Sequence, residues 1–296
     1  MPDIIYRYDQ LVERKKYESS DTRSKFYNSY HWGQRKLLIN EIYFLTKYND
    51  PTKIILYIGA ADGYHIDFLA KMFPKNKFIL YDPGTFKIKS SQQIEIHKQF
   101  FTDQEARKYV GRGNNILFIS DIRNLNVVKN IKNKNEKEAD DIIVEDLNKQ
   151  RKWIEIIRPY RSILKFRTPY RPGTTHYFAG KIYLQQYGPL SSETRLLVKD
   201  PTKFTNYNNQ EFDEKMYYFN INIRNKSYDI MKLVIDKLDI INNWDTTMEL
   251  LILKKYLTIV TKNYSELNLI KLFTDITAYL TAYNKNYLRK LRKVHK

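Results

Sequence analysis

The sequence predicts an α/β fold with a mostly parallel, doubly wound sheet, and three observations lead to this expectation. Short apolar segments rich in β-branched residues alternate along the chain with segments of helical periodicity. The first apolar segment ends at a glycine turn, from Gly59 to Gly63, which opens a helical segment. Acids follow two of the apolar segments, at Asp82 and Asp121, and open sheets bind ligands at the carboxyl ends of their strands.

The order of these segments specifies the sheet further. Strands are expected at 54–58, 78–82, 94–97, 115–121 and 161–166, with helices at 33–47, 65–73 and 141–157. Alternation of this kind is typical of parallel strands joined by helical crossovers. Two further apolar segments, 181–185 and 194–198, have no long helix between them, so we expect an antiparallel pair at one edge. The seven strands would form one mostly parallel sheet with one antiparallel edge strand.

The rest of the chain is expected to pack around this core as one domain spanning residues 1–296. Residues 1–32 form a polar, tyrosine-rich N-terminal extension, residues 33–225 the core, and residues 226–296 a helical C-terminal addition. No internal repeat or low-complexity linker divides them. A charged loop is expected at 128–141, and the basic cluster at 289–293 is either an RNA contact or a solvated chain end.

Composition limits the functional classes. The chain has 296 residues, 42% of them hydrophobic, and 51 Lys and Arg against 33 Asp and Glu give a net charge of +18. This excess favours a polyanion such as nucleic acid as partner, and the alternatives are solubility or the codon drift of an AT-rich genome. No long uncharged apolar span points to a membrane. The absence of cysteine excludes disulfides and thiolate metal sites, and with no secretory segment at the N-terminus we expect a cytoplasmic protein.

A glycine turn joins the first predicted strand to the helix after it. Gly59 and Gly63 have the spacing Gly-x-x-x-Gly, which lacks the third glycine of a dinucleotide fingerprint. About twenty residues beyond Gly59, Asp82 ends the next predicted strand, where a carboxylate can accept hydrogen bonds from ribose hydroxyls. This pattern suits S-adenosylmethionine, which has no pyrophosphate to bind. An ordinary turn of another α/β protein is the alternative.

Charged residues also occur at unusual places in the apolar pattern. Lys165 lies within an otherwise apolar strand, and Glu193 heads the strand at 194–198. A lysine drawn into an apolar site beside another cation has a lowered pKa and can act as a base, whereas a structural ion pair is the alternative. Lys36 lies one residue before the first helical stripe begins, and its ammonium group either reaches the surface or joins the other charges.

Six short segments in the same order resemble a known family, the poxvirus cap-specific mRNA nucleoside-2′-O-methyltransferases, which also serve as the stimulatory subunit of the viral poly(A) polymerase. The resemblance runs from about residue 17 to residue 225. It implies a Rossmann-like class I methyltransferase fold, S-adenosylmethionine as cofactor, and capped mRNA and a poly(A) polymerase catalytic subunit as partners. It also implies the host cytoplasm or the virion as location. The segments are 33–38 (GQRKLL), 57–66 (YIGAADGYHI), 119–123 (ISDIR), 164–167 (LKFR), 192–197 (SETRLL) and 214–218 (EKMYY).

The resemblance assigns roles to four charged residues. Lys36, Asp121, Lys165 and Glu193 fall on the family's Lys-Asp-Lys-Glu tetrad. Lys165 would be the general base that takes the proton of the 2′-hydroxyl. Asp121 would hold the Lys165 amine, and Lys36 and Glu193 would tune the protonation of that amine. No metal is implied. The positions that fall on S-adenosylmethionine contacts are Gln34, Tyr57, Gly59, Gly63, Asp82, Phe101 and Thr102.

A site for the cap is implied less completely. Tyr17 and Tyr170 occupy the positions of two rings that sandwich 7-methylguanine, and Asp213 falls on an acid that binds the base edge. Arg167 and Ser192 fall among the residues that contact the cap or RNA. Pro172 stands where the family has a second acid.

Two further functions stay open beside cap 2′-O-methylation. One is a non-catalytic RNA-binding processivity factor of a viral poly(A) polymerase, which the charge of +18 favours. The other is methylation of a different RNA site or cap.

Overall fold

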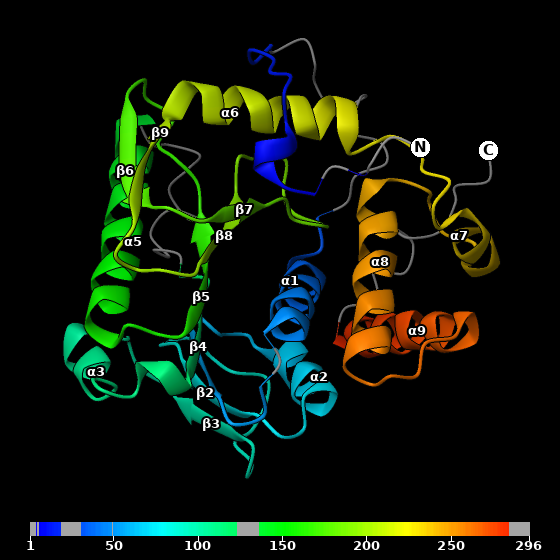
Figure 1. Cartoon of the computed structure of the whole chain (residues 1–296), viewed down its shortest axis with the longest axis horizontal. Helices are drawn as coiled ribbons and strands as arrows, with labels where there is room; N and C mark the ends of the chain where they lie inside the picture. The colour runs from blue at the N-terminus through cyan, green and yellow to red at the C-terminus, as the bar shows by residue number, and fades with distance from the viewer. Residues whose placement is uncertain (1–3, 5, 19–30, 49, 123–135, 284–296) are drawn as a thin grey trace.

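The structure is a computed structural model that describes residues 4, 6–18, 31–48, 50–122 and 136–283. The basic cluster expected at 289–293 and most of the charged loop expected at 128–141 lie outside these residues. At the centre of the fold is a seven-stranded sheet with helices on both sides (Figure 1). Its strands are β1 (Ile54–Ile58), β2 (Lys77–Tyr81), β3 (Ile94–His97), β4 (Ile116–Ser120), β5 (Arg161–Phe166), β7 (Lys181–Tyr183) and β8 (Thr194–Val198).

The strand order is β3-β2-β1-β4-β5-β8-β7, and β1 to β5 are parallel. β8 runs antiparallel to both β5 and β7. The expected α/β fold with a mostly parallel seven-stranded sheet is therefore confirmed, with one difference in detail. The reversed strand β8 lies one place in from the edge, and the edge strand β7 has the same direction as β1 to β5.

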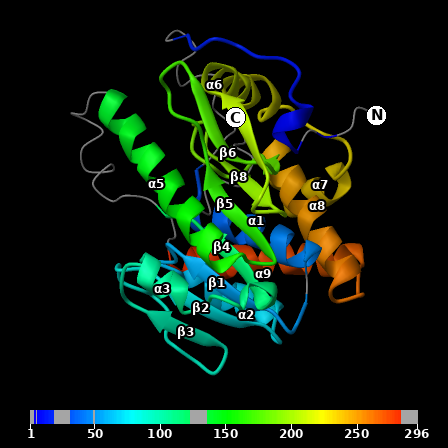
Figure 2. The same cartoon turned by 60° about the vertical axis from the view of Figure 1, so that its left-hand side comes forward.

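Alternating side chains of the strands enter two different cores. Ile55, Tyr57 and Ile119 contribute to one core, with α1 (Gly33–Lys47), α2 (Tyr64–Met72), α8 (Trp244–Ile259) and α9 (Glu266–Tyr283). Leu56, Ile58 and Phe118 contribute to the other, with α3 (Asp103–Arg107) and α5 (Glu136–Ile157). Figure 2 shows these two helical layers on opposite sides of the sheet. Because strand side chains alternate between faces, the continuous apolar runs predicted strands that are buried on both sides.

A second, two-stranded sheet was not predicted. It pairs β6 (Thr174–Phe178) with β9 (Phe204–Asn208) in antiparallel register. Most residues of these two strands are partly or fully exposed, so they lack the apolar run that signals a strand. Other elements that the pattern did not predict are short or irregular: α3, α6 (Asn209–Tyr218), the 3-10 turns η1 (Tyr8–Gln10) and η4 (Gly113–Asn115), and the π-helical turn η5 (Phe219–Ile223).

Residues 6–8 of the N-terminal extension pack on the core. Arg7 forms a β-bridge with Tyr183 of the edge strand β7, and the carbonyl of Tyr6 accepts a hydrogen bond from the backbone N–H of Leu184. The ring of Tyr8 stacks on Phe212 of α6 at a centroid distance of 4.8 Å. The extension therefore covers the edge of the sheet that β7 would otherwise expose.

The C-terminal helices, including α7 (Lys232–Leu238), are tied to the core by buried charges. Nε of Arg35 on α1 donates to Oε1 and Oε2 of Glu249 on α8, at 3.0 and 2.9 Å, and both side chains are fully buried. The hydroxyl of Tyr187 donates to Oε2 of the same carboxylate. We propose on this basis that the C-terminal helices and the core form one folding unit. Within the described part of the chain, no helix has the length and apolarity needed to cross a membrane.

Replacing Glu249 by Gln tests this connection. The change leaves the Arg35 charge buried without a counter-ion, and breaking a buried pair in this way costs about 3 kcal/mol. We expect one cooperative urea transition at a lower midpoint, with the C-terminal helices unfolding together with the sheet. The matched control is Glu266→Gln, which removes a half-exposed partner of Lys237 and costs less than about 1 kcal/mol. Equal midpoints for the two variants, or two separate transitions, would contradict the proposal.

Candidate active site

The carboxyl ends of β1 and β4 meet at the point where the strand order reverses. Gly59, directly after β1, has φ of +81°, and a Cβ there would lie 2.8 Å from the carbonyl carbon of Asp121. The sequence interpretation assigned this glycine to contact with S-adenosylmethionine. The structure adds a different reason: only glycine lets the chain after β1 pass so close to the backbone after β4. Gly63, with φ of +71°, precedes the first turn of α2.

Asp82 joins the glycine turn to the end of β2. Its Oδ2 accepts a hydrogen bond from the backbone N–H of Ala61 at 3.1 Å, and its Oδ1 accepts one from Gly84 at 2.7 Å. A carboxylate offers about four acceptor positions. The two remaining positions fit hydroxyl groups of a ligand, so the site is compatible with the ribose of an adenosyl group.

A buried polar network lies behind the turn. The Oε1 atom of Gln34 lies 2.7 Å from Nδ1 of His65, whose Nε2 lies 3.0 Å from Glu41. The hydroxyl of Tyr57 donates to Glu41 at 2.6 Å. Burial, together with the adjacent Glu41 carboxylate, raises the pKa of Tyr57 well above its usual value. The Tyr57 side chain is therefore held in the core, and a ligand in the turn can meet only its backbone.

Phe101 and Thr102 have different surroundings. The Phe101 ring is buried edge-on against Trp153 and Tyr81, at centroid distances of 5.1 and 4.9 Å. Thr102 is exposed, and its hydroxyl accepts a hydrogen bond from Glu105 N–H at the start of α3. Phe101 thus supports the core between sheet and helix, whereas Thr102 is accessible.

The four charged residues of the predicted tetrad come together. Nζ of Lys36 lies 2.6 Å from Oε1 of Glu193, and both side chains are buried. Nζ of Lys165 lies 3.3 Å from Oε2 of Glu193 and 3.5 Å from Oδ1 of Asp121. The alternative in which Lys36 extends to the surface is therefore not realised.

The register of the sheet explains why these side chains meet. Residues 163 and 165 of β5 share a face, as do residues 119 and 121 at the end of β4, and this face packs against α1. Lys165 is paired with Arg195 across the β5–β8 ladder. Because β8 is reversed, its first residues lie beside the carboxyl end of β5, which places Glu193 in the site.

Arg195 is a fifth member of the cluster that the sequence interpretation missed. Its Nη2 donates to Oδ1 of Asp121 at 2.7 Å, and its side chain is 4% exposed. It also lies 3.9 Å from Glu193. A signal was present in the sequence, because Arg195 is two residues after Glu193 and strand side chains alternate, so both point to one face.

Burial and neighbouring charges shift several pKa values in the cluster. Burial lowers the pKa of Lys36, although the Glu193 carboxylate opposes this effect. Burial alone would raise the pKa of Asp121, but Arg195, Lys165 and Lys36 together hold it well below its usual value. Asp121 is thus anionic at neutral pH, and the cations around it depend on that charge.

Lys165 has the most exposed side chain of the three cations in the cluster, at 13%. Its Nζ atom is itself buried and has ion-pair contacts, but it makes no hydrogen bond with the described residues. An amine in this position retains the capacity to interact with an incoming hydroxyl group.

The residues predicted for the cap lie on two surface segments. The ring of Tyr17 is 73% exposed and contacts Tyr217 at a centroid distance of 5.3 Å. The ring of Tyr170 is 45% exposed, with the Arg167 guanidinium 3.8 Å from its centroid. Each ring is thus held by a neighbour of its own in this structure.

Three other predicted residues surround this region. Oγ of Ser192 and Nη2 of Arg167 are buried and make no hydrogen bond to any described residue. Asp213 is half-buried on α6. Buried polar atoms normally have partners, so Ser192 and Arg167 offer hydrogen-bonding capacity to a ligand.

Comparison with known proteins gives a family match, two poxvirus relatives and a solved structure. A family model described as "Poly A polymerase regulatory subunit" matches residues 1–293. The chain is 29% identical over 245 residues to the cap-specific mRNA (nucleoside-2'-O-)-methyltransferase of Fowlpox virus (strain NVSL), covering 74% of this chain and 76% of that protein. The protein of the same name from Myxoma virus (strain Lausanne) is 27% identical over 244 residues, covering 74% and 69%. A crystal structure described as a ribosomal RNA methyltransferase from Plasmodium falciparum covers 55% of this chain and 95% of its own, at 14% identity and a TM-score of 0.34.

The lowered pKa of Asp121 predicts a pH-dependent stability. A carboxyl group with a lower pKa in the folded state stabilises the protein above its unfolded pKa of about 4, and this contribution is lost as the pH falls further. We expect Asp121→Asn to lower the free energy of unfolding by about 3 kcal/mol at pH 7, and the difference from the unsubstituted protein to shrink between pH 4 and pH 2. Urea denaturation across this range measures it.

The control for this experiment is Asp275→Asn. Asp275 is a half-exposed partner of Lys271 on α9, so its loss costs less than about 1 kcal/mol. A difference for Asp121→Asn that stays constant from pH 7 to pH 2 would show that the cluster does not hold this carboxylate in its ionised form.

Proposed function

This chain belongs to the poly A polymerase regulatory subunit family, and from that premise we propose that it is an mRNA cap 2′-O-methyltransferase. It transfers a methyl group from S-adenosylmethionine to the ribose 2′-hydroxyl of the first transcribed nucleotide of capped mRNA. The Fowlpox and Myxoma virus relatives carry the name of this activity. The observation that supports the proposal most strongly is the amine of Lys165, which lies between two carboxylates without a hydrogen bond to a described residue, at the end of the sheet where ligands bind.

Lys165 is the general base of the proposed reaction. S-adenosylmethionine supplies a methyl group bonded to a positively charged sulfur. In its unprotonated form the Lys165 amine would accept the proton of the 2′-hydroxyl, while the ribose oxygen would bond to the methyl carbon as the carbon–sulfur bond breaks. The leaving thioether is neutral, so the protein's main contribution is to hold the reacting groups in line.

The other charged side chains position Lys165. Asp121 and Glu193 lie 3.5 and 3.3 Å from its Nζ and orient the amine. Arg195 fixes Asp121, and Lys36 fixes Glu193. Neither carboxylate can then rotate away without leaving a buried cation unpaired, which is costly.

Cofactor, cap and RNA would occupy the surfaces around this cluster. For S-adenosylmethionine we propose the backbone at Gly59 and Gly63 and the carboxylate of Asp82, with Gln34 and Thr102 at either end. Tyr57 would contribute its backbone and Phe101 structural support. The cap and RNA would contact Tyr17, Tyr170, Arg167, Ser192 and Asp213. The host cytoplasm, where viral mRNA is modified, is the proposed location.

Replacing Lys165 by Arg tests the catalytic role. Arginine keeps the positive charge but cannot lose its proton near neutral pH, so we expect transfer of labelled methyl to capped RNA to fall at least about 100-fold. Binding of S-adenosylmethionine, measured by calorimetry, should stay within about twofold because the cofactor surface is untouched. The control is Lys149→Arg, an exposed lysine of α5 paired with Glu145. Wild-type transfer by the Lys165 variant would show that another group is the base.

A second function is favoured by the family itself and by the charge of +18. We propose that the chain also binds the catalytic subunit of a poly(A) polymerase and keeps it on RNA. Tail extension by a poxvirus poly(A) polymerase catalytic subunit should lengthen when the chain is added. The Lys165→Arg variant should stimulate it equally, because RNA retention needs no methyl transfer. Unchanged tail lengths together with failure to co-purify would contradict this second function.

A further inference from the structure

The amino-terminal end of β5 lies opposite the charged cluster and brings several basic side chains together. β5 begins at Arg161, and Nη1 of Arg161 lies 3.5 Å from the carbonyl oxygen of Lys199, which directly follows β8. Lys181 begins the next strand, β7, where it is paired with Leu197 of β8. Because β8 runs antiparallel to its neighbours, its end lies beside the beginnings of β5 and β7. Three adjacent strands thus each place a cation at this end of the sheet.

Tyrosine rings connect these cations to two lysines on helices. Cζ of Arg161 lies 5.6 Å from the ring centroid of Tyr48. Nζ of Lys47, at the end of α1, lies 5.8 Å from the Tyr48 centroid and 5.6 Å from that of Tyr43. Nζ of Lys255 on α8 lies 5.5 Å from the Tyr43 centroid. Since a ring attracts a cation within about 6 Å, the two rings hold these three cations in one row.

The five cations present positive charge that no described acid neutralises. The exposed ones are Lys181, Lys199 and Lys255, and Lys47 and Arg161 are partly exposed. We call these five residues the amino-end basic surface. The acids next to them in the sequence, Asp50 and Asp200, pair with Lys53 and Lys203 instead.

A tyrosine beside this surface responds to its charge. Nζ of Lys47 donates to the hydroxyl oxygen of Tyr183 at 3.0 Å. Burial alone would raise the pKa of Tyr183, but hydrogen bonds with Lys47 and Tyr43 and the charges of Lys47 and Lys181 lower it. The positive potential at this end of the sheet is therefore strong enough to outweigh the effect of burial.

Two elements join this surface to the proposed active site and show how far apart the two lie. α1 carries Lys36 in its first turn and Lys47 eleven residues later, which is about 16 Å along the helix axis. β5 carries Arg161 at its beginning and Lys165 near its end, about 13 Å along the strand. The amino-end basic surface is thus a separate place on the molecule, although a flexible polymer can reach both.

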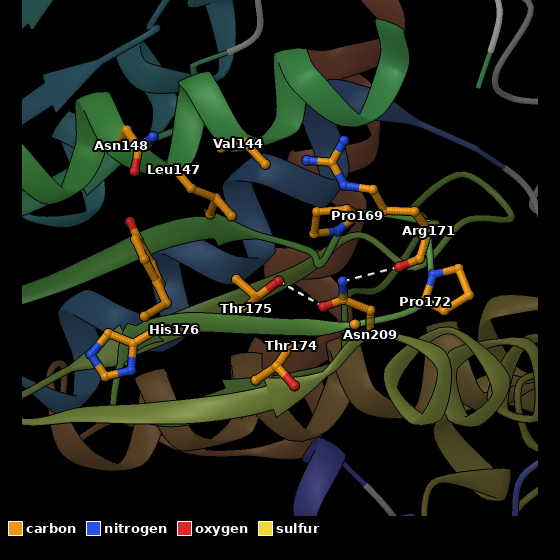
Figure 3. A pocket seen from close by; sticks show the side chains of 12 residues that line it. Val144, Leu147, Asn148, Pro169, Arg171, Pro172, Thr174, Thr175, His176 and Asn209 are labelled. Carbon is orange, nitrogen blue, oxygen red and sulfur yellow. Dashed lines mark hydrogen bonds between the residues drawn. The ribbon is translucent and has the colours of Figure 1, made fainter. Parts of the chain in front are cut away.

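The proposed cap surface lies toward the active-site end of β5. Figure 3 shows Pro169, Arg171 and Pro172, which follow β5 and line a cavity of about 260 Å³ beside α5. Pro172 occupies a position implied for the cap, so this cavity adjoins the proposed cap surface. No residue that lines it belongs to the amino-end basic surface.

From these observations, and resting on the proposed retention of RNA, we propose that the amino-end basic surface binds the phosphate backbone of the transcript downstream of the cap. Contacts with phosphates carry no sequence information, so this surface holds RNA of any sequence. The occupant is a single strand rather than a duplex. A single strand can bend from one end of the sheet to the other, whereas a duplex is stiff over such distances.

Replacing Lys181, Lys199 and Lys255 together by Gln tests this proposal on exposed side chains. The probe is an unstructured, uncapped RNA of about 30 nucleotides, longer than one typical single-strand site. Its binding is followed by fluorescence anisotropy between about 50 and 200 mM salt. Each lost phosphate contact lowers the slope of log K against log salt by about 0.7. We therefore expect the slope to fall by about 2, and the affinity at 0.1 M salt to fall about 10- to 100-fold.

The matched control replaces Lys149, Lys226 and Lys271 by Gln. It changes the net charge of the chain by the same amount, but these lysines lie on α5, after η5 and on α9. The control should keep the slope of the unsubstituted protein. Equal slopes for the two triple variants would show that only total charge matters and would overturn the proposal. Urea midpoints of both variants confirm that each is folded.

Cross-linking locates the RNA without removing a charge cluster. The chain contains no cysteine, so Lys199→Cys creates a single attachment point for a photoreactive group. With a capped RNA of about 30 nucleotides bound, we expect this group to cross-link to nucleotides several positions after the cap. Lys226→Cys is the control and should give little product. The same yield from both positions would contradict a defined RNA surface.

The outcomes separate this proposal from the functions proposed above. Methyl transfer to a short capped RNA should stay within about twofold in the triple surface variant, because the substituted lysines are far from Lys165. A reduced slope in that variant, with no methyl transfer even by the unsubstituted protein, would contradict the enzymatic function alone. RNA binding through this surface without any lengthening of tails would contradict the polymerase function and leave the surface in place.

Discussion

The cluster of five charged side chains at the carboxyl ends of the strands is the constraint on which the rest of the structure depends. Three cations, Lys36, Lys165 and Arg195, surround the carboxylates of Asp121 and Glu193. No single ion of this set could be buried alone, because the desolvation cost would exceed any packing gain. The cluster therefore fixes the relation of α1, β4, β5 and β8. The reversed direction of β8 contributes to this arrangement. Because β8 is antiparallel to β5, its first residues lie beside the carboxyl ends of the parallel strands, next to Glu193.

The first turn of α1 links this cluster to the C-terminal helices. Lys36 pairs with Glu193 in the site, while its neighbour Arg35 pairs with Glu249 of α8 on the other side of the helix. Arg35 is also enclosed by the rings of Trp32 and Phe273. Adjacent residues of one helix thus connect the site and the helical addition, so that loss of the C-terminal helices would displace the helix that carries Lys36.

The sequence predicted much of the central sheet. The elements and contacts that it did not predict have physical reasons for leaving no clear sequence pattern. Strands buried on both faces give continuous apolar runs, which is why β1, β4 and β5 were predicted closely. The exposed strands β6 and β9 give no such run, and their pairing joins segments about thirty residues apart in the sequence. The tetrad residues were found by order and resemblance. Arg195 is not part of the tetrad pattern, although its place two residues after Glu193 puts both side chains on one face of the strand. Gly59 also allows close contact with the backbone after β4. The local sequence does not predict this contact, because it does not specify which strand lies beside β1.

The central claim is that the Lys165 amine, held by Asp121 and Glu193, faces the hydroxyl that is methylated. A crystal structure with S-adenosylhomocysteine and a short capped RNA measures this most directly. We predict that the 2′-oxygen of the first transcribed nucleotide lies at hydrogen-bond distance, about 2.6–3.2 Å, from Nζ of Lys165, with the sulfur on the opposite side of that oxygen. A ribose hydroxyl that lies out of reach of Lys165, with the cofactor bound elsewhere than above Gly59, would contradict the account.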